Sequence, residues 1–189
     1  MRFFANFSVA DFSNTYLLGP DGPGGAVLID PGIFDEGVLR MIEDHKLYVR
    51  AVLLTHAHEA HTRGIKTLMK IYEASVHCVD PTLMDVPALH LLREGTLELA
   101  GLIFTVLDTP GHSSDSVCFK IGNLLFTGDT LAAGSIGSTS SGYERALLLA
   151  SIRGKLLELD EETFVFPGHG PPTKIGIEKK INPCLEDKI

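Results

Sequence analysis

The chain has 189 residues and a formal net charge of −8, with 16 Lys and Arg against 24 Asp and Glu. This length predicts a single domain over residues 1–189, and 44% hydrophobic with 21% charged residues excludes wholesale disorder. The net negative charge disfavours non-specific binding to the phosphate backbone of nucleic acids, so we expect no nucleic-acid partner.

Membrane and secretion signals are missing from the sequence pattern. No apolar run reaches the roughly 18 residues that cross a bilayer, and residues 1–7 contain one basic residue but no sustained apolar stretch. We therefore expect neither a membrane partner nor a signal peptide. Cys78, Cys118 and Cys184 form an odd, sparse set, which fits reduced thiols in the cytoplasm better than a disulfide framework.

The first half of the chain alternates short apolar runs, Gly/Pro turns and amphipathic stretches. The spacing of apolar residues and the Gly/Pro turn signals predict strands at 26–29, 51–54 and 75–79 and helices at 36–47 and 62–72. Asp35 is a plausible N-cap for the first helix. Residues 81–95 are ambiguous, and we interpret them as a loop with a short helix over an opening.

Strands dominate the second half. They are predicted at 97–99, 102–107, 117–121, 123–127 and 163–166, with one helix at 143–159 and a charged tail from Lys174. We place Cys118, inside a strand, in the core. Two β-rich halves with helices outside them predict an α/β protein in which two sheets face each other between helices.

Potential metal ligands occur in four segments, each directly after an expected strand. The first segment holds His56 and His58, which flank one residue. Extended backbone directs both imidazoles to the same side. His61 follows at the start of the next helix, and the other three segments contribute His112, Asp129 and His169 from glycine-containing turns. Strand ends are where a rigid sheet presents functional groups.

These residue types suit a catalytic metal. Neutral imidazole and carboxylate bind Zn and Fe, and a set that leaves one position open lets Zn lower the pKa of its water to about 7. One histidine at a strand end is usually a surface or capping residue, and we regard His45, His77 and His90 as ordinary. Five histidines and one aspartate in four equivalent settings are improbable as independent accidents.

The complete set resembles the metallo-β-lactamase superfamily, whose pattern is an early Asp, H-x-H-x-D-H, and then His, Asp and His in separate turns. The matching residues here are Asp30, His56, His58, His61, His112, Asp129 and His169. Residues 128–137 and 167–171, followed by Glu178 and Asn182, are similar to the short bacterial glyoxalase II-like hydrolases. Those members lack the helical C-terminal domain that binds glutathione in longer enzymes.

The resemblance implies an αββα sandwich of two mixed β-sheets flanked by helices, with a metal site at one edge. It implies a first site of His56, His58 and His112, a second site with His61 and His169, and Asp129 as the bridging and catalytic carboxylate. A metal-bound hydroxide would attack the carbonyl of a small-molecule thioester or ester. Zn is the expected cofactor, as one or two ions, and Fe and Mn remain open, as does the oligomeric state.

The chain departs from the pattern where the Asp of H-x-H-x-D-H is replaced by Ala60. Alanine has no donor atom, and even the loss of a group behind the ligands commonly costs about 10–100-fold in affinity or activity. Glu59 is a candidate catalytic substitute, although its side chain should leave the backbone in another direction, and it is otherwise a solvated loop charge. Residues 113–116 replace a usual Pro-Gly turn. Ser138 stands where the subgroup often has Arg, which puts recognition of anionic substrates in doubt.

Three functions therefore remain open. The first is a glyoxalase II-like hydrolase with a weakened second metal site. The second is a mononuclear iron sulfur dioxygenase, another branch of the resembled superfamily, in which His56, His112 and Asp129 would form a 2-His-1-carboxylate triad. The third is a catalytically impaired metal-binding member in which Ala60 marks lost activity.

Overall fold

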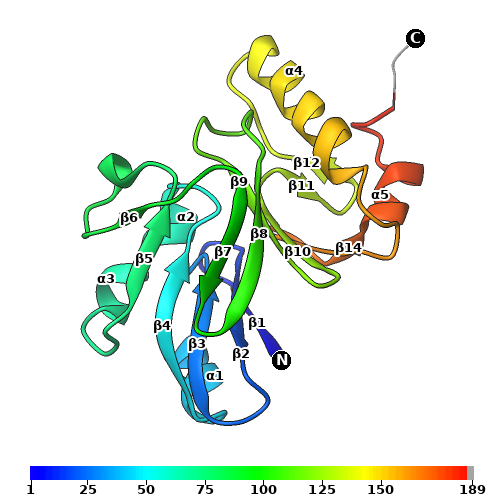
Figure 1. Cartoon of the computed structure of the whole chain (residues 1–189). Helices are drawn as coiled ribbons and strands as arrows, with labels where there is room; N and C mark the ends of the chain where they lie inside the picture. The colour runs from blue at the N-terminus through cyan, green and yellow to red at the C-terminus, as the bar shows by residue number, and fades with distance from the viewer. Residues whose placement is uncertain (187–189) are drawn as a thin grey trace.

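The computed structural model describes residues 1–186 and contains two six-stranded mixed sheets (Figure 1). The first sheet has the order β1 (Arg2–Ser8), β2 (Ser13–Gly19), β3 (Gly24–Ile29), β4 (Leu47–Leu53), β5 (Ser75–Cys78) and β6 (Leu89–His90). Its strands are antiparallel from β1 to β3 and parallel from β3 to β6.

The second sheet has the order β14 (Thr173–Lys174), β13 (Phe164–Pro167), β10 (Leu124–Gly128), β9 (Val117–Ile121), β8 (Leu102–Asp108) and β7 (Gly95–Leu99). Only the β10–β13 pair of this sheet is parallel among the described residues. A small hairpin, β11 (Leu131–Ala132) and β12 (Ser135–Ile136), follows β10.

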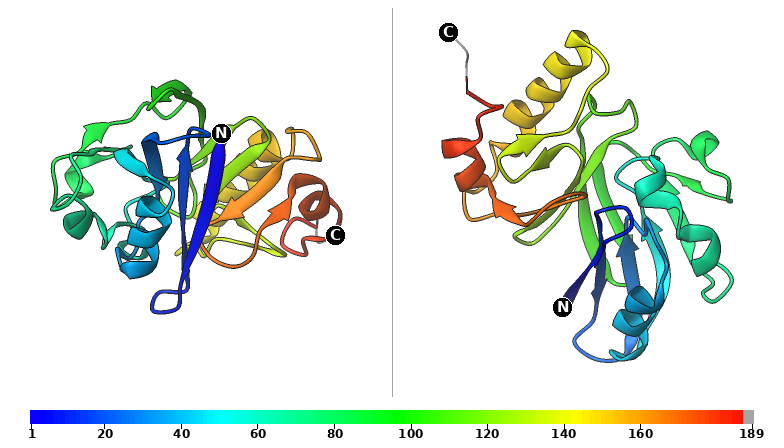
Figure 2. Two further views of the ribbon diagram at one scale, coloured as in Figure 1. Left: turned by 90° about the horizontal axis from the view of Figure 1, so that it is seen from below. Right: turned by 180° about the vertical axis from the view of Figure 1, so that it is seen from behind.

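Helices cover the outer face of each sheet. The helices are α1 (Glu36–Glu43), α2 (Glu59–Thr62), α3 (Ile65–Leu68), α4 (Gly142–Ser151) and α5 (Ile175–Ile181), with a 3₁₀ turn at Pro81–Leu83 and a π-helical turn at Ile152–Leu156. The first three pack on the first sheet, whereas α4 and α5 lie beside the second (Figure 2). The predicted αββα sandwich of two mixed sheets is confirmed.

Three apolar layers explain this arrangement. On β3, Val27 and Ile29 face the second sheet, and Leu28 between them faces α1. Successive strand side chains point to opposite faces, so a strand buried on both faces is a continuous apolar run. Cys118 is fully buried under α4, as predicted. Within residues 1–186, no helix is both long and apolar enough to span a membrane.

Several predicted boundaries were wrong. Where a helix is predicted at 62–72, α2 instead begins earlier and ends at Thr62, and α3 covers only Ile65–Leu68. The break comes at Gly64, whose N–H donates to the Pro31 carbonyl (3.0 Å) and which lies so close to that turn that a Cβ would be 2.6 Å from the same oxygen. The helix predicted at 36–47 ends at Glu43, since Lys46 takes a left-handed conformation (φ 55°) before β4. The helix predicted at 143–159 changes to the π-helical turn after Ser151.

The sequence patterns also missed elements. β1 and β2 were not predicted, and the charged tail forms β14 and α5. Backbone bonds join the two sheets at one edge: Asn14 N donates to Gly168 O (2.8 Å), and Val117 N donates to Thr55 O (2.9 Å). This edge is where β4, β8, β10 and β13 deliver the predicted ligands.

Candidate metal centre

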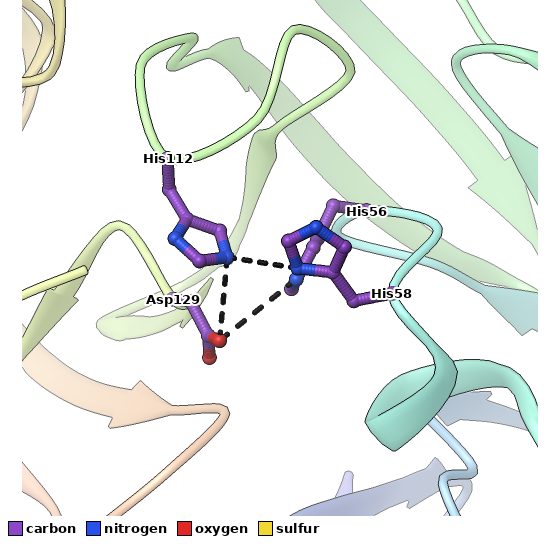
Figure 3. A group of neighbouring side chains, drawn as sticks. All are labelled: His56, His58, His112 and Asp129. Atoms are coloured by element: carbon purple, nitrogen blue, oxygen red, sulfur yellow. Dashed lines mark hydrogen bonds and ion pairs between the residues drawn. The ribbon is translucent and has the colours of Figure 1, made fainter. Parts of the chain in front are cut away.

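Two clusters of potential ligands share Asp129 at this edge. One holds His56, His58, His112 and Asp129, the other holds His61, Asp129 and His169, and the ligand atoms of each lie within 4.8 Å of one another. Figure 3 shows the first cluster, whose rings and carboxylate point into one common space. The structure therefore brings together all six residues that the sequence predicted as metal ligands.

Asp129 is central to both clusters. Its Oδ2 lies 3.9 Å from His56 Nε2 and 3.5 Å from His112 Nε2, and dashed lines in Figure 3 mark both contacts. The same oxygen is 3.6 Å from His169 Nε2, and Oδ1 is 3.5 Å from His61 Nε2. One carboxylate thus faces both clusters, which is the placement that a bridging ligand needs.

Hydrogen bonds orient the rings from behind. His112 Nδ1 donates to the carbonyl of Ser138 (2.8 Å), and His169 Nδ1 donates to the carbonyl of Phe12 (2.9 Å). A proton fixed on Nδ1 leaves the Nε2 lone pair for an ion. His58 presents Nδ1 instead, which lies 3.0 Å from His112 Nε2.

The loop between β4 and α2 is held by two carboxylates. Asp30 accepts from Thr55 N (2.8 Å) and from Thr55 Oγ1 (2.7 Å). Asp115 accepts from Ala57 N (2.8 Å). Asp30 belongs to the family pattern, but sequence reasoning missed Asp115, which lies in the 113–116 segment noted only as a departure. Loop-fixing bonds of this kind set where His56 and His58 point.

The residues fit a cation. Three buried ligand atoms have no hydrogen-bond partner: His56 Nε2, His61 Nε2 and Asp129 Oδ1. The other ring nitrogen of His61, Nδ1, faces Asp30 Oδ2 at 3.3 Å. Buried polar atoms are almost always paired, so unpaired nitrogen and oxygen atoms that converge on one space call for an ion. Imidazole and carboxylate donors suit Zn, Fe and Mn.

Burial and neighbouring charges set the protonation of this centre. Burial, then the charge of His61, lowers the pKa of His56, and burial with the charge of His112 lowers that of His58. Burial also lowers the pKa of His61, but Asp30 and Asp129 outweigh it and raise that pKa to about 10. Burial raises the pKa of Asp129, but His61 reverses this and holds it below the usual range. An ion entering the second cluster must therefore displace a proton from His61.

Two glycines make room for the ligands. A Cβ on Gly168 would lie 2.5 Å from Asp129 Oδ1 and 2.5 Å from His61 Cε1. Gly128 has φ 49°, and a Cβ there would lie 2.3 Å from Thr55 Oγ1. A side chain at either position would clash with these neighbouring atoms, which gives a steric reason for glycine in both strand-end turns.

Glu59 lies outside both clusters. Its carboxylate is 76% exposed and pairs with Arg63 Nε at 3.0 Å, one turn along α2. The first turn of the helix directs the side chain away from His56, so the geometry gives no support to Glu59 as a catalytic substitute. Ala60 places no donor atom in the second cluster, which keeps three ligands.

A buried polar clamp supports the loop after Asp129. Glu178 accepts from Gly134 N (2.9 Å), Thr173 Oγ1 (2.6 Å) and Asn182 Nδ2 (2.7 Å). Asn182 Nδ2 also lies 3.1 Å from the carbonyl of Ser135. The two residues that contributed to the glyoxalase II-like resemblance therefore act by holding a loop.

Comparisons with known proteins agree with this geometry. A family model described as Metallo-beta-lactamase superfamily matches residues 9–169. A Haemophilus influenzae protein named hydroxyacylglutathione hydrolase GloC is 32% identical over 95% of this chain and 96% of its own length.

Two solved structures are similar over nearly their whole length. The crystal structure of the BLEG-1 B3 metallo-beta-lactamase has a TM-score of 0.88 and 35% identity, covering 97% of this chain and 99% of that one. A di-iron-bound form of TTHA1623 has a TM-score of 0.81 and 32% identity, covering 95% and 98%.

Proposed function

The chain belongs to the metallo-beta-lactamase superfamily, and on this premise we propose that it is a metal-dependent hydrolase of the glyoxalase II-like kind, acting on a thioester or related ester. The observation that carries the proposal is the pair of ligand clusters around Asp129, with buried ligand atoms that have no other partner. The hydroxyacylglutathione hydrolase GloC supports the reaction class.

A bound zinc, iron or manganese ion would supply an acidified water and would polarise the substrate carbonyl. Asp129 stays ionised at neutral pH, because its pKa is held low by the histidines around it, so it can accept a hydrogen bond from the attacking water. The carbonyls of Ser138 and Phe12 keep the rings of His112 and His169 in place. Hydrolysis forms a C–O bond from water to the acyl carbon and breaks the C–S bond, and the departing thiolate takes the proton.

The loss of a donor at Ala60 makes the two clusters unequal. The first has four donors and the second has three, so we expect one ion bound tightly and the other weakly. Zinc is our first choice for the tight site, and the di-iron-bound form of TTHA1623 keeps iron in consideration.

A second candidate is a mononuclear iron dioxygenase acting on a persulfide. Its supporting observation is that His56, His112 and Asp129 lie in one cluster and match the 2-His-1-carboxylate ligand set of such enzymes. The missing donor at Ala60 is consistent with a centre that binds a single ion. The third candidate, a catalytically impaired binder, shares the same cluster and predicts bound metal without turnover.

One experiment separates these candidates. Protein purified without chelator is analysed for metal identity and ions per chain, then assayed for hydrolysis of thioesters and lactones and for oxygen uptake with glutathione persulfide. We expect hydrolysis that is lost in His56→Ala and retained in His90→Ala, a histidine on the exposed β6 strand. Metal-loaded protein that is inert toward thioesters and lactones would overturn the proposal. Oxygen uptake would favour the second candidate, and inertness in both assays the third.

A further inference from the structure

The first cluster takes its histidines from two loops that belong to different sheets. His56 and His58 follow β4 of the first sheet, and His112 follows β8 of the second. Figure 3 shows these rings facing one another from a cyan loop and a green turn. Their ligand atoms lie within 4.8 Å of one another, and this closeness depends on the spacing between the two loops. A group that fixes the spacing would therefore control how tightly the first cluster binds an ion.

The carboxylate of Asp115 connects the two loops. Asp115 lies in the turn that carries His112 and is only 4% exposed. Its Oδ1 accepts from the hydroxyl of Ser113 (2.7 Å), which holds the carboxylate within its own turn. Its Oδ2 accepts from the N–H of Ala57 (2.8 Å), the residue between the two histidines of the β4 loop. One buried side chain thus joins the loops directly beside three ligands.

Further bonds hold the turn that carries this carboxylate. Ser113 Oγ lies 2.7 Å from Ser116 Oγ, and the N–H of Ser113 donates to the same Ser116 oxygen (3.2 Å). From outside the turn, Arg93 donates to the carbonyl of Ser114 (2.8 Å) and pairs with Asp108 at the end of β8 (3.0 Å). The acceptor for Ala57 is therefore presented by a turn that is itself held in place.

The bond to Ala57 extends a contact that the backbone only begins. Among residues 1–186, the backbone bond that joins these two loops runs from Val117 N to Thr55 O (2.9 Å), which is before the first histidine. Asp115 precedes Val117 by two residues, and Ala57 follows Thr55 by two. The side-chain bond therefore carries the connection past His56. Unlike a backbone bond, it requires a hydrogen-bond acceptor in the side chain at position 115.

We propose that Asp115 is a positioning residue for the first ion, which fixes the spacing of the two histidine loops and thereby strengthens metal binding there. Asp115 belongs to neither ligand cluster, so it acts through Ala57 and Ser113 rather than by contact with the ion. The inference rests on the proposed metal centre and adds a residue to it. With Ala60 removing a donor from the second cluster, Asp115 widens the difference in affinity between the two.

The test measures cobalt binding to the metal-free protein in competition with a chromophoric chelator. Asp115→Ala releases both loops and should weaken the tighter ion about 10–100-fold. The amide of Asp115→Asn can accept from Ala57 N–H and donate to Ser113 Oγ, so this variant should stay within about threefold of the parent chain. Ser113→Ala removes only the bond within the turn and should show a loss smaller than that of Asp115→Ala.

Asp160→Ala is the matched control. Asp160 also accepts from a backbone N–H, that of Glu162 (2.8 Å), but it precedes β13, at the other end of that strand from His169. Its removal should leave cobalt affinity unchanged. The visible absorption of bound cobalt gives a second readout, because it reports the geometry of the ligands. Asp115→Ala should shift these bands, whereas Asp115→Asn and Asp160→Ala should keep those of the parent chain.

Cobalt affinity and absorption bands in Asp115→Ala that equal those in Asp160→Ala would overturn the inference. An Asp115→Asn variant as weak as Asp115→Ala would also overturn it, since the carboxylate would then act through its charge. If Asp115→Ala does not fold, Ser113→Ala decides, and an affinity equal to that of Asp160→Ala counts against the proposal. A parent chain that binds no cobalt would overturn the metal centre as well, whereas a metal-loaded parent chain inert toward thioesters would overturn only the hydrolase function.

Discussion

Restoring a carboxylate at Ala60 tests how the second cluster is built. The cluster has three donors, from His61, Asp129 and His169, and Ala60 precedes His61 in the first turn of α2. Loss of a group behind the ligands costs about 10–100-fold, and a direct ligand should be worth at least as much. Ala60→Asp should therefore tighten the second ion at least about tenfold, or about 1.4 kcal/mol.

The assay is a cobalt titration in competition with a chromophoric chelator, fitted to two sites. Thr67→Asp adds the same charge at an exposed position of α3 and should leave both affinities close to those of the parent chain. If Ala60→Asp binds the second ion no more tightly than Thr67→Asp does, the second cluster is not the ion site that its geometry indicates. If the variant also loses turnover with the second ion bound, the parent centre works with a single ion.

Three further outcomes follow from the contacts of the centre. Asp30 and Asp129 raise the pKa of His61 to about 10. The proton of His61 therefore stabilises the metal-free fold fully below pH 6.5, and this stabilisation is lost as the pH rises through 10. At pH 7, metal binding to the second cluster should release this proton, which is measured as a calorimetric binding enthalpy that varies with the ionisation enthalpy of the buffer. Gly168→Ala places a Cβ 2.5 Å from Asp129 Oδ1, so it should lower the free energy of unfolding by about 1–3 kcal/mol and reduce the amount of bound metal. Urea unfolding measures the first effect and metal analysis the second. Unchanged metal content would contradict the argument that the Cβ crowds Asp129. Glu178→Ala removes a buried carboxylate that accepts three hydrogen bonds and should destabilise by about 3 kcal/mol or more, whereas Glu158→Ala at an exposed position should shift the melting temperature little.

Hydrophobic patterns in the sequence correctly predicted the elements whose conformation depends mainly on residues close together in the chain. The run at 26–29 is a strand because both of its faces are buried. The four ligand segments converge because each follows a strand that ends at the same edge, and His61 is carried on the helix α2 that comes directly after His56 and His58. The division between α2 and α3 depends instead on Gly64 touching the Pro31 turn, a contact between segments that local periodicity does not contain. The first strands, β1 and β2, were missed because polar residues interrupt the apolar pattern there. The side chain of the buried Asn14, for example, is satisfied by the carbonyls of Pro167 and Gly170, which are distant in sequence.

Parts of the site were also beyond sequence reasoning. Asp115 fixes the ligand loop from 58 positions away, and nothing in its own segment indicates that partner. Phe12 is invisible as a site residue for another reason, since its backbone carbonyl rather than its side chain contacts His169. Backbone partners of this kind leave no residue-type signature.

That use of main-chain carbonyls has a consequence for evolution. His112 and His169 take their orientation from the peptide oxygens of Ser138 and Phe12, and every amino acid provides such an oxygen. Substitutions at positions 12 and 138 can therefore change the side chains next to the two clusters while the main-chain oxygens that orient His112 and His169 stay in place. The serine at position 138 accordingly provides the same carbonyl oxygen that any other residue would provide there.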